Sequence, residues 1–490
     1  MAMPTIYPAG TTVYNPEKCW NGFTVLSVLP HHDTYLIDMN GNEVHKWKDS
    51  TGMPARVYPG GHLMASTRYW SKGRQDHKTL QLKDFNNNII WEFRKWEEVP
   101  ADPGEPESSP GNMWIARQHH DYQIAGNPVG YYAPGMEPTP GKGKVLILGH
   151  TVYNQPEINK NLSIIDDVLY EVTQEGKIVW TWKAGEHFKE YGFDADAIEA
   201  MQGIKQSRGG SIDWWHQNSA SYLGPNKWYN QGDERFHPDN IILDSRNANV
   251  ICIISKKTGK VVWKCGPNYD KEPDKNLGWI IGLHHAHMIP KGLPGEGNIL
   301  IYDNGGFAGY GKPNPMAPSG SNIVKRDYSR VIEFDPITKT IVWEYSPKFL
   351  RYFSWDNFRQ YSPYISAAQR LSNGNTMITE GGMGRVFEVT AKGELVWEFV
   401  SPYVGVEGPP SSAPVHMSYR AYRVPYKWVP QLKKPQEIPV VPPKYGQFKI
   451  PAGGSWEGVD AVRPWVAVPK GKGTGKKGAG KKGAGKKGAQ

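Results

Sequence analysis

Short hydrophobic runs that end on a tryptophan, each preceded by a polar or glycine-containing turn, recur along this chain. Six of them are GNEVHKW ending at Trp47, NNNIIW at Trp91, EGKIVW at Trp180, TGKVVW at Trp263, TKTIVW at Trp343 and KGELVW at Trp397. Their alternating or apolar β-type residues predict strands. A strand–turn–strand unit repeated at roughly 40 or more residues indicates a propeller or array, because each unit buries its apolar faces only against its neighbours. The pattern therefore predicts an all-β fold, a six-bladed β-propeller.

The predicted blades occupy residues 34–402. Long insertions at 95–117, 184–213 and 306–327 interrupt them, and loops of this length on a propeller are expected to lie on one face and shape a mouth. Residues 187–206 alone have the apolar spacing of a helix.

The ends of the chain differ in composition from the blades. Residues 1–33 are a lead-in, and residues 403–469 are Pro-rich, which predicts an extended arm packed on the propeller. Residues 470–490 form a Lys/Gly/Ala repeat that lacks apolar residues to bury, so we expect a disordered tail.

Charge is concentrated in this tail. The net charge is +9, and eight lysines after residue 469 carry +8 of it, so the predicted propeller is close to neutral. The tail is expected either to bind an anionic partner, such as nucleic acid, anionic lipid or an acidic protein, or to act as a solubilising extension.

Targeting and cysteine signals are sparse. No apolar run approaches the ~20 residues of a membrane helix, and the N-terminus lacks the pattern of a secretory signal. We expect a cytoplasmic protein as the chain stands, or a periplasmic one if a leader has been removed. Three cysteines without a CxxC motif, Cys19, Cys252 and Cys265, predict buried thiols, with a Cys252–Cys265 disulfide as the alternative.

Histidines precede the inner strands of several predicted blades. They occur in QHHDYQIAG (His119, His120), WWHQNSASYLG (His216, with Asn218) and LHHAHMIPKG (His284, His285, His287). Because equivalent positions of propeller blades lie on a small ring about the axis, these imidazoles are expected to converge. Counting back four residues from Ile124 and Ile289 selects His120 and His285, with His284 and His287 as alternatives to His285.

Such a cluster permits two kinds of chemistry. It can supply a nucleophile with acid–base partners, or it can hold a transition metal through neutral imidazoles, with His120, His216, His285 and His287 as ligands. Asn218 and Arg246, the latter in IILDSRNANV, are poor metal ligands but good donors to a tetrahedral oxyanion. Arg385, Arg420 and Arg423 are weaker candidates for the same role. Neither of the familiar nucleotide-phosphate loops, GxxxxGK[ST] and GxGxxG, occurs.

Several of these motifs together resemble those of the bacterial arylsulfotransferase family, the aryl-sulfate:phenol type that uses no nucleotide sulfate donor. The resemblance covers roughly Thr34–Arg423 and rests on the HHD ending at Asp121, the HxNS of His216–Ser219, the SR ending at Arg246, the GNILIYDNGG strand after His285, and the later RAYR. It implies a six-bladed propeller with a central active site, a small aromatic substrate and no cofactor.

The same resemblance implies roles for individual residues. His285 would be the nucleophile that carries the sulfuryl group, and His120, His216, Asn218 and Arg246 would bind its oxygens and help to protonate the departing phenolate. Two other functions stay open at this point. One is a metal-dependent enzyme that acts on an aromatic compound, and the other is a non-catalytic propeller that presents a binding face.

Overall fold

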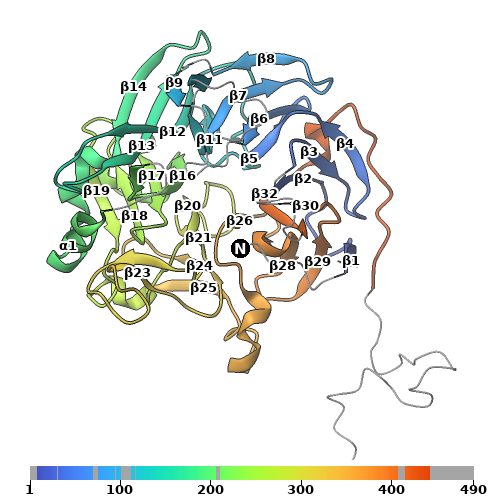
Figure 1. The fold of residues 1–490 in the computed structure, drawn as a ribbon. Helices are drawn as coiled ribbons and strands as arrows, with labels where there is room; N and C mark the ends of the chain where they lie inside the picture. The colour runs from blue at the N-terminus through green and yellow to red at the C-terminus, as the bar shows by residue number, and fades with distance from the viewer. Residues whose placement is uncertain are drawn as a thin grey trace, which may run out of the picture. The chain divides into compact units, whose positions relative to one another are not determined.

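The six Trp-terminated runs each form a strand at, or next to, the outer end of a sheet. The computed structural model describes residues 8–441 apart from 30, 70–75, 94, 96, 101–111, 116, 206–209, 352 and 407–413. These residues form an all-β, propeller-like arrangement in which the sheets lie around a common centre (Figure 1).

Four sheets stand separately. They are, in spatial order, β32 (Met417–Val424), β2 (Phe23–Leu29), β3 (Thr34–Ile37) and β4 (Glu43–Trp47); β16 (Gln217–Tyr222), β17 (Ile241–Ser245), β18 (Val250–Ile254) and β19 (Val261–Cys265); β20 (His284–Met288), β21 (Ile299–Asp303), β24 (Arg330–Phe334) and β25 (Ile341–Tyr345); and β26 (Ala367–Arg370), β27 (Thr376–Glu380), β28 (Arg385–Val389), β29 (Leu395–Val400) and β1 (Gly10–Tyr14). Within each sheet, neighbouring strands are antiparallel.

The remaining blade strands belong to one nine-stranded sheet. Its members are β5 (Thr51–Tyr58), β6 (His62–Tyr69), β7 (His77–Lys83), β8 (Ile89–Glu92), β11 (Gln118–Ile124), β12 (Val145–Tyr153), β13 (Ser163–Val172), β14 (Ile178–Lys183) and β15 (Ser211–Asp213). The sequence predicts six separate blades, and the structure has four. The other two predicted blades are continuous with each other because Gln118 of β11 pairs with His77 of β7.

Tryptophan side chains connect each sheet segment to the next. Their indole N–H groups donate to backbone carbonyls in a closed cycle: Trp47 to Asp84 (3.0 Å), Trp91 to Gln174 (3.0 Å), Trp182 to Gly259 (2.8 Å), Trp263 to Pro336 (2.8 Å), Trp343 to Ala391 (3.0 Å) and Trp397 to Met39 (2.8 Å). In the third run the donor is Trp182 rather than Trp180, which instead lies beneath the Lys256 ammonium. The repeated tryptophans therefore join neighbouring sheets as well as filling their own.

The buried bond of Trp397 provides a stability prediction. Trp397 is fully buried, and Trp397→Phe removes the donor, leaves the Met39 carbonyl with only the longer bond from the Thr11 hydroxyl at 3.4 Å, and shrinks a packed ring. We expect the free energy of unfolding to fall by about 1–2 kcal/mol, measured from urea midpoints. Trp343→Phe is the matched control, because its bond is solvent-exposed, and it should cost less. Equal losses in the two variants would contradict this role.

Strands from both ends of the chain enter the sheets. β1 pairs with β29, and β2 pairs with β32, so the sheets reach beyond residues 34–402 in both directions. The sequences explain this: β2 reads FTVLSVL, a run of β-type residues, and β32 reads MSYRAYRV, in which aromatic and aliphatic residues are interspersed with polar ones.

The described part of the Pro-rich arm contacts the sheets. Val440 forms a backbone bridge with Tyr14, and the Gln431 side-chain amide donates to the Gly60 carbonyl at 2.8 Å. The predicted basic tail, residues 470–490, lies outside the described residues.

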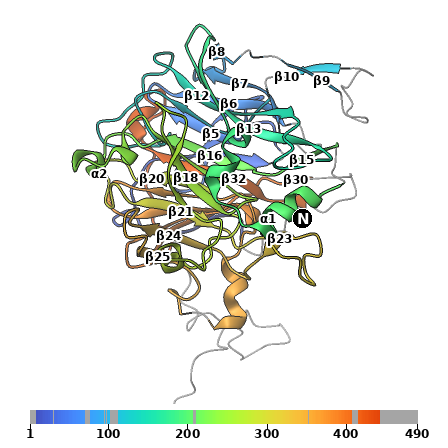
Figure 2. The same cartoon turned by 90° about the vertical axis from the view of Figure 1, so that its left-hand side faces the viewer.

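The three predicted insertions carry small elements of their own. These are the hairpin β9 (Glu97–Pro100) and β10 (Asn112–Ile115), the helices η1 (Ala184–Tyr191) and α1 (Ala195–Gly203) followed by β15, and the hairpin β22 (Ala308–Tyr310) and β23 (Ser321–Val324). Figure 2 shows α1, β15 and β23 on one side of the sheets and the short helix α2 (Lys227–Asn230) on the other.

The helix predicted at 187–206 is present but divided. Gly192, with φ 75°, ends η1 in the left-handed conformation, and the Asp194 carboxylate caps α1 by accepting from the Ala197 N–H. Short helical turns that the sequence does not predict occur elsewhere: α2 (Lys227–Asn230), η3 (Glu234–Phe236), η4 (Asp274–Leu277), η5 (Ser354–Gln360), η6 (Gly381–Met383) and η7 (Tyr426–Trp428). They are too short to show a helical period. A last hairpin joins β30 (Gly405–Val406) and β31 (Pro414–Val415).

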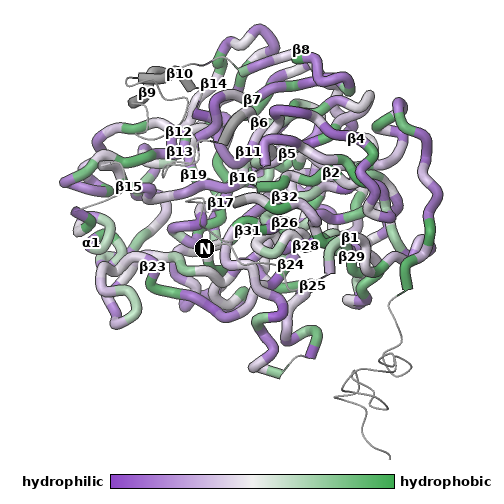
Figure 3. Tube along the Cα trace, turned by 45° about the vertical axis from the view of Figure 1, so that its right-hand side comes forward, coloured by the Kyte–Doolittle hydropathy of each residue, from purple (hydrophilic) through white to green (hydrophobic). Residues whose placement is uncertain are grey.

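Apolar side chains fill the space between neighbouring sheets. One such cluster joins Ile242, Ile251 and Ile253 to Ile301 and Phe334 of the next sheet. The rim is more polar, as in the turn beside β8 (Figure 3). All three cysteines are buried free thiols, which confirms that prediction against the disulfide alternative.

Candidate active site

Three of the predicted site histidines share an unusual backbone conformation. His120, His216 and His285 have φ values of 49°, 54° and 57°, in the left-handed region that non-glycine residues rarely adopt. His120 and His285 lie where an inner strand changes register against its neighbour, and His216 immediately precedes β16, whose register shifts between Gln217 and Ala220. Such bulges re-aim side chains, and strained residues of this kind cluster at functional sites. The three positions thus share one backbone conformation.

His120 and His216 lie ring to ring. Their centroids are 5.0 Å apart in an edge-on arrangement, and the Tyr419 ring lies 5.7 Å from that of His120. Burial alone would lower the pKa of His216, but the Asp213 carboxylate, 2.5 Å from its Nδ1, raises it. Burial and the neighbouring His216 hold the pKa of His120 well below its usual value. The pair therefore combines one ring that favours the protonated form with one that stays neutral.

The HHAH segment contributes three buried rings with different partners. His284 Nδ1 lies 2.8 Å from the Asn304 side-chain oxygen, and its Nε2 accepts from the Ile365 N–H at 3.1 Å. His287 Nδ1 faces the His285 carbonyl at 2.9 Å, and its Nε2 lies 2.9 Å from the Tyr131 hydroxyl.

His285 is bonded through one nitrogen only. Its Nε2 lies 3.3 Å from the Tyr422 hydroxyl, and among the described residues its Nδ1 makes no hydrogen bond of ordinary geometry, although the Ala368 backbone lies close enough to the ring to act on its pKa. Burial, His287 and the charges of Arg420 and Arg56 hold its pKa well below the usual value. Of the three rings, His285 is thus the neutral imidazole with an uncommitted nitrogen.

Arg246 lies beside His216. Its backbone N–H donates to the His216 carbonyl at 3.0 Å, and its guanidinium donates to Asn247 at 2.9 Å. Burial lowers the pKa of Arg246, and the Asp213 charge opposes this. After burial, the Arg246 charge is also the largest cause that lowers the pKa of His284. Arg246 therefore provides positive charge on the side of the site where His216 and His284 lie.

Asn218 connects two sheets. Its side-chain amide donates to the Leu283 carbonyl at 3.0 Å, two residues before His285, while its backbone N–H donates to Asp244. The Asn218 side chain thus fixes the start of β20 against β16.

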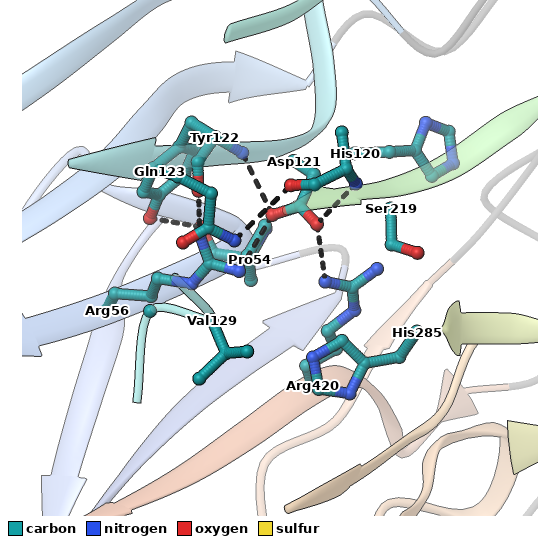
Figure 4. A network of polar contacts seen from close by, with 12 residues as sticks. Pro54, Arg56, His120, Asp121, Tyr122, Gln123, Val129, Ser219, His285 and Arg420 are labelled. Atoms are coloured by element: carbon teal, nitrogen blue, oxygen red, sulfur yellow. Dashed lines mark hydrogen bonds and ion pairs between the residues drawn. The ribbon is translucent and has the colours of Figure 1, made fainter. Parts of the chain in front are cut away.

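The structure brings His120, His216 and Arg246 together directly and attaches Asn218 to the strand of His285. Between His285 and either His120 or His216, the described part of the chain has no ring contact. Figure 4 shows the Arg420 guanidinium between Asp121 and His285.

A buried ion-pair network, which the sequence analysis did not assign to the site, lies at this junction. The Asp121 carboxylate pairs with Arg56 at 2.7 Å and with Arg420 at 3.2 Å, and Arg420 also donates to the Asn218 carbonyl at 2.6 Å. All three charged side chains are 0–1% exposed. In a strand, the spacing in RAYR puts Arg420 and Tyr422 on the same face of β32. This spacing is the sequence signal that could have favoured Arg420 over Arg385 and Arg423 as an oxyanion-binding residue. Arg423, by contrast, pairs with Glu388.

A second cluster lies behind His120. One group of potential metal ligands is gathered among the described residues, namely His119, His150 and Asp167. The predicted set of His120, His216, His285 and His287 is not gathered in this way. Burial lowers the pKa of His119 to about 3, so its ring is neutral, as metal binding requires.

Across the described residues, no helix has the length and apolar character needed to cross a bilayer.

Comparison with known proteins gives one family and several distant folds. The family model described as Arylsulfotransferase (ASST) matches residues 139–402. No curated protein matches the chain. Among solved structures, a protein of unknown function from Bacteroides caccae is similar at 8% identity and a TM-score of 0.40, over 82% of this chain and 99% of that one. Virginiamycin B lyase from Staphylococcus aureus is similar at 10% identity and a TM-score of 0.34, over 86% of this chain and 96% of that one.

Proposed function

The chain belongs to the arylsulfotransferase family, and from this premise we propose that it moves a sulfuryl group from an aryl sulfate to a phenol through a covalent intermediate on His285. The observation that carries the assignment of the nucleophile is the bonding of the HHAH rings. His284 and His287 have both nitrogens engaged, whereas His285 keeps Nδ1 uncommitted.

The first displacement forms the sulfohistidine. With its proton on Nε2, facing Tyr422, His285 attacks sulfur through the Nδ1 lone pair, and the bond from sulfur to the aryl oxygen breaks. The departing phenolate takes a proton from His216, whose raised pKa favours the charged acid. Arg420 and Arg246 stabilise the negative charge on the sulfuryl oxygens and the leaving oxygen.

The second displacement restores the enzyme. The acceptor phenol returns a proton to His216 as its oxygen bonds to sulfur, and the nitrogen–sulfur bond breaks. His285 regains its neutral ring. Because the same groups act in both directions, no external base or cofactor is required for the proton balance.

We also infer that the nine-stranded sheet works as two blades, which gives six blades around the site. The cycle of six indole donors supports this, since the segments ending in β8 and β14 each use a tryptophan as the separate sheets do.

Activity on p-nitrophenyl sulfate tests the proposal. With phenol as acceptor we expect nitrophenol release together with phenyl sulfate, identified by mass spectrometry, and little release without an acceptor. Formation of free sulfate instead of phenyl sulfate would make the protein a hydrolase. Absence of nitrophenol with every phenolic acceptor would refute the proposed reaction.

A further inference from the structure

We propose that His119, His150 and Asp167 form a binding site for one divalent transition-metal ion, with Zn²⁺ as the ion whose ligand preferences fit best. Its three ligands are not among the sulfuryl-transfer residues, although His119 contacts His120, and the proposal does not depend on the proposed reaction. It also differs from the metal set predicted from the sequence.

The fold places the three side chains on adjacent strands of one sheet. His150 of β12 and Asp167 of β13 are directly paired across the ladder, and His119 lies on β11, whose Gln118 pairs with Gly149. Directly opposite residues of an antiparallel pair project to the same face. The three side chains therefore meet without any contribution from a loop, and they are 0–4% exposed.

The distances between the potential ligand atoms suit a metal. His119 Nε2 lies 3.1 Å and His150 Nε2 lies 3.6 Å from the same Asp167 Oδ1. Two ligands that each bind zinc at about 2.0–2.1 Å in a tetrahedral arrangement are separated by roughly 3.3 Å. Two imidazoles and a carboxylate, with a fourth position for water, make a common set for this ion.

Two of these atoms lack a well-formed hydrogen bond. Within the described residues, His119 Nε2 and Asp167 Oδ1 are buried and lie 3.1 Å apart as an ion pair, but neither atom makes a hydrogen bond of ordinary geometry. A buried polar atom without a partner costs free energy, and a buried carboxylate costs more. A divalent cation between them would remove both costs.

The opposite side of each ligand is held by a hydrogen bond. His150 Nδ1 bonds to the Asp76 carboxylate, Asp167 Oδ2 accepts from the Gln217 N–H at 3.0 Å, and His119 Nδ1 lies 2.8 Å from His120 Nδ1. Outer partners of this kind orient metal ligands and select the free nitrogen. The remaining atoms, His119 Nε2, His150 Nε2 and Asp167 Oδ1, face the position proposed for the metal ion.

The rings must move slightly to bind. His119 and His150 lie stacked, with centroids 3.5 Å apart and 18° between their planes. An imidazole lone pair lies in its ring plane, so we expect the rings to rotate out of this stack when the ion enters.

The test uses the untagged full chain, stripped by chelation and dialysis. We expect it to bind one Zn²⁺ per chain in a calorimetric titration with ZnCl₂, and Co²⁺ in its place to give the visible absorption of a four-coordinate nitrogen and oxygen site. His119→Gln and Asp167→Asn should each weaken binding at least tenfold, and Asp76→Asn, which alters the outer partner of His150 and the ion pair of Asp76 with Arg117, should weaken it about 10- to 100-fold. His237→Gln, at a surface histidine, is the matched control and should bind as the original chain does.

Each outcome decides the proposal. Retention of Fe²⁺ in preference to Zn²⁺, lost in the same variants, supports the site and changes the ion. Circular dichroism and thermal unfolding of each variant without metal distinguish misfolding from the loss of a metal ligand. If one ligand variant fails to fold, the affinity of Asp76→Asn for Zn²⁺ provides an independent test. Failure of the folded chain to bind either ion, or binding that survives both ligand variants, would overturn the assignment.

Discussion

His285→Ala is expected to reduce sulfuryl transfer from p-nitrophenyl sulfate to phenol by at least ~10³-fold, because it removes the atom that carries the group between the two displacements. The loss should appear in kcat, since substrate contacts made by Arg246 and His216 remain. In the unaltered protein, rapid alkaline quenching should trap a sulfuryl group on the peptide that contains His285, and the variant should lack it.

Variants of the neighbouring rings provide the controls. His287→Gln disturbs bonds to the His285 carbonyl and Tyr131 but leaves Nδ1 of His285 in place, so transfer should fall far less. Arg246→Ala should retain residual activity. If His285→Ala keeps its activity while His284→Ala loses it, the nucleophile is His284 and the assignment made from hydrogen bonding is wrong.

Asp121→Ala is expected to lower the free energy of unfolding by about 3–5 kcal/mol, because it leaves two buried guanidinium groups without their counter-ion. Arg56 and Arg420 have side chains that are 0% exposed, and they come from different strands, β5 and β32, to the same carboxylate of β11. The carboxylate also accepts from the Tyr122 and Ala220 N–H groups, so four donors lose their acceptor together.

An ion pair at the surface provides the control for Asp121→Ala. Asp233 and Arg235 are as close as Asp121 and Arg56, at 2.7 Å, but both are partly exposed to solvent. Asp233→Ala should change the free energy of unfolding by no more than about 1 kcal/mol, judged from urea midpoints. A similar loss in both variants would show that burial of the Asp121 network contributes little to stability.

Repeating local patterns were readable from the sequence. The Trp-terminated runs predict the outer strands because a hydrophobic period and a turn are properties of a few consecutive residues. The spacing between His120 and Ile124, repeated at His285 and Ile289, likewise identifies two positions that share a left-handed backbone in the structure.

Features that depend on contacts between segments far apart in the sequence could not be predicted. The join between β7 and β11 depends on one ladder pair, and the pairing of β2 with β32 depends on residues about 400 positions apart. The sequence shows Asp121 inside HHD and Arg420 inside RAYR, but only the fold brings them to 3.2 Å. The cluster behind His120 was missed for the same reason, since His150 and Asp167 stand in unremarkable strands.

The pairing of β2 with β32 has a consequence for how the protein is made. The ribosome releases β2 early, whereas its partner emerges only when residue 424 has been synthesised. Until then the nascent chain carries an open strand edge, and such edges invite pairing with other chains. Pairing of β2 with β32 therefore cannot precede synthesis of residue 424, and the edge of β2 stays open while the intervening residues are made.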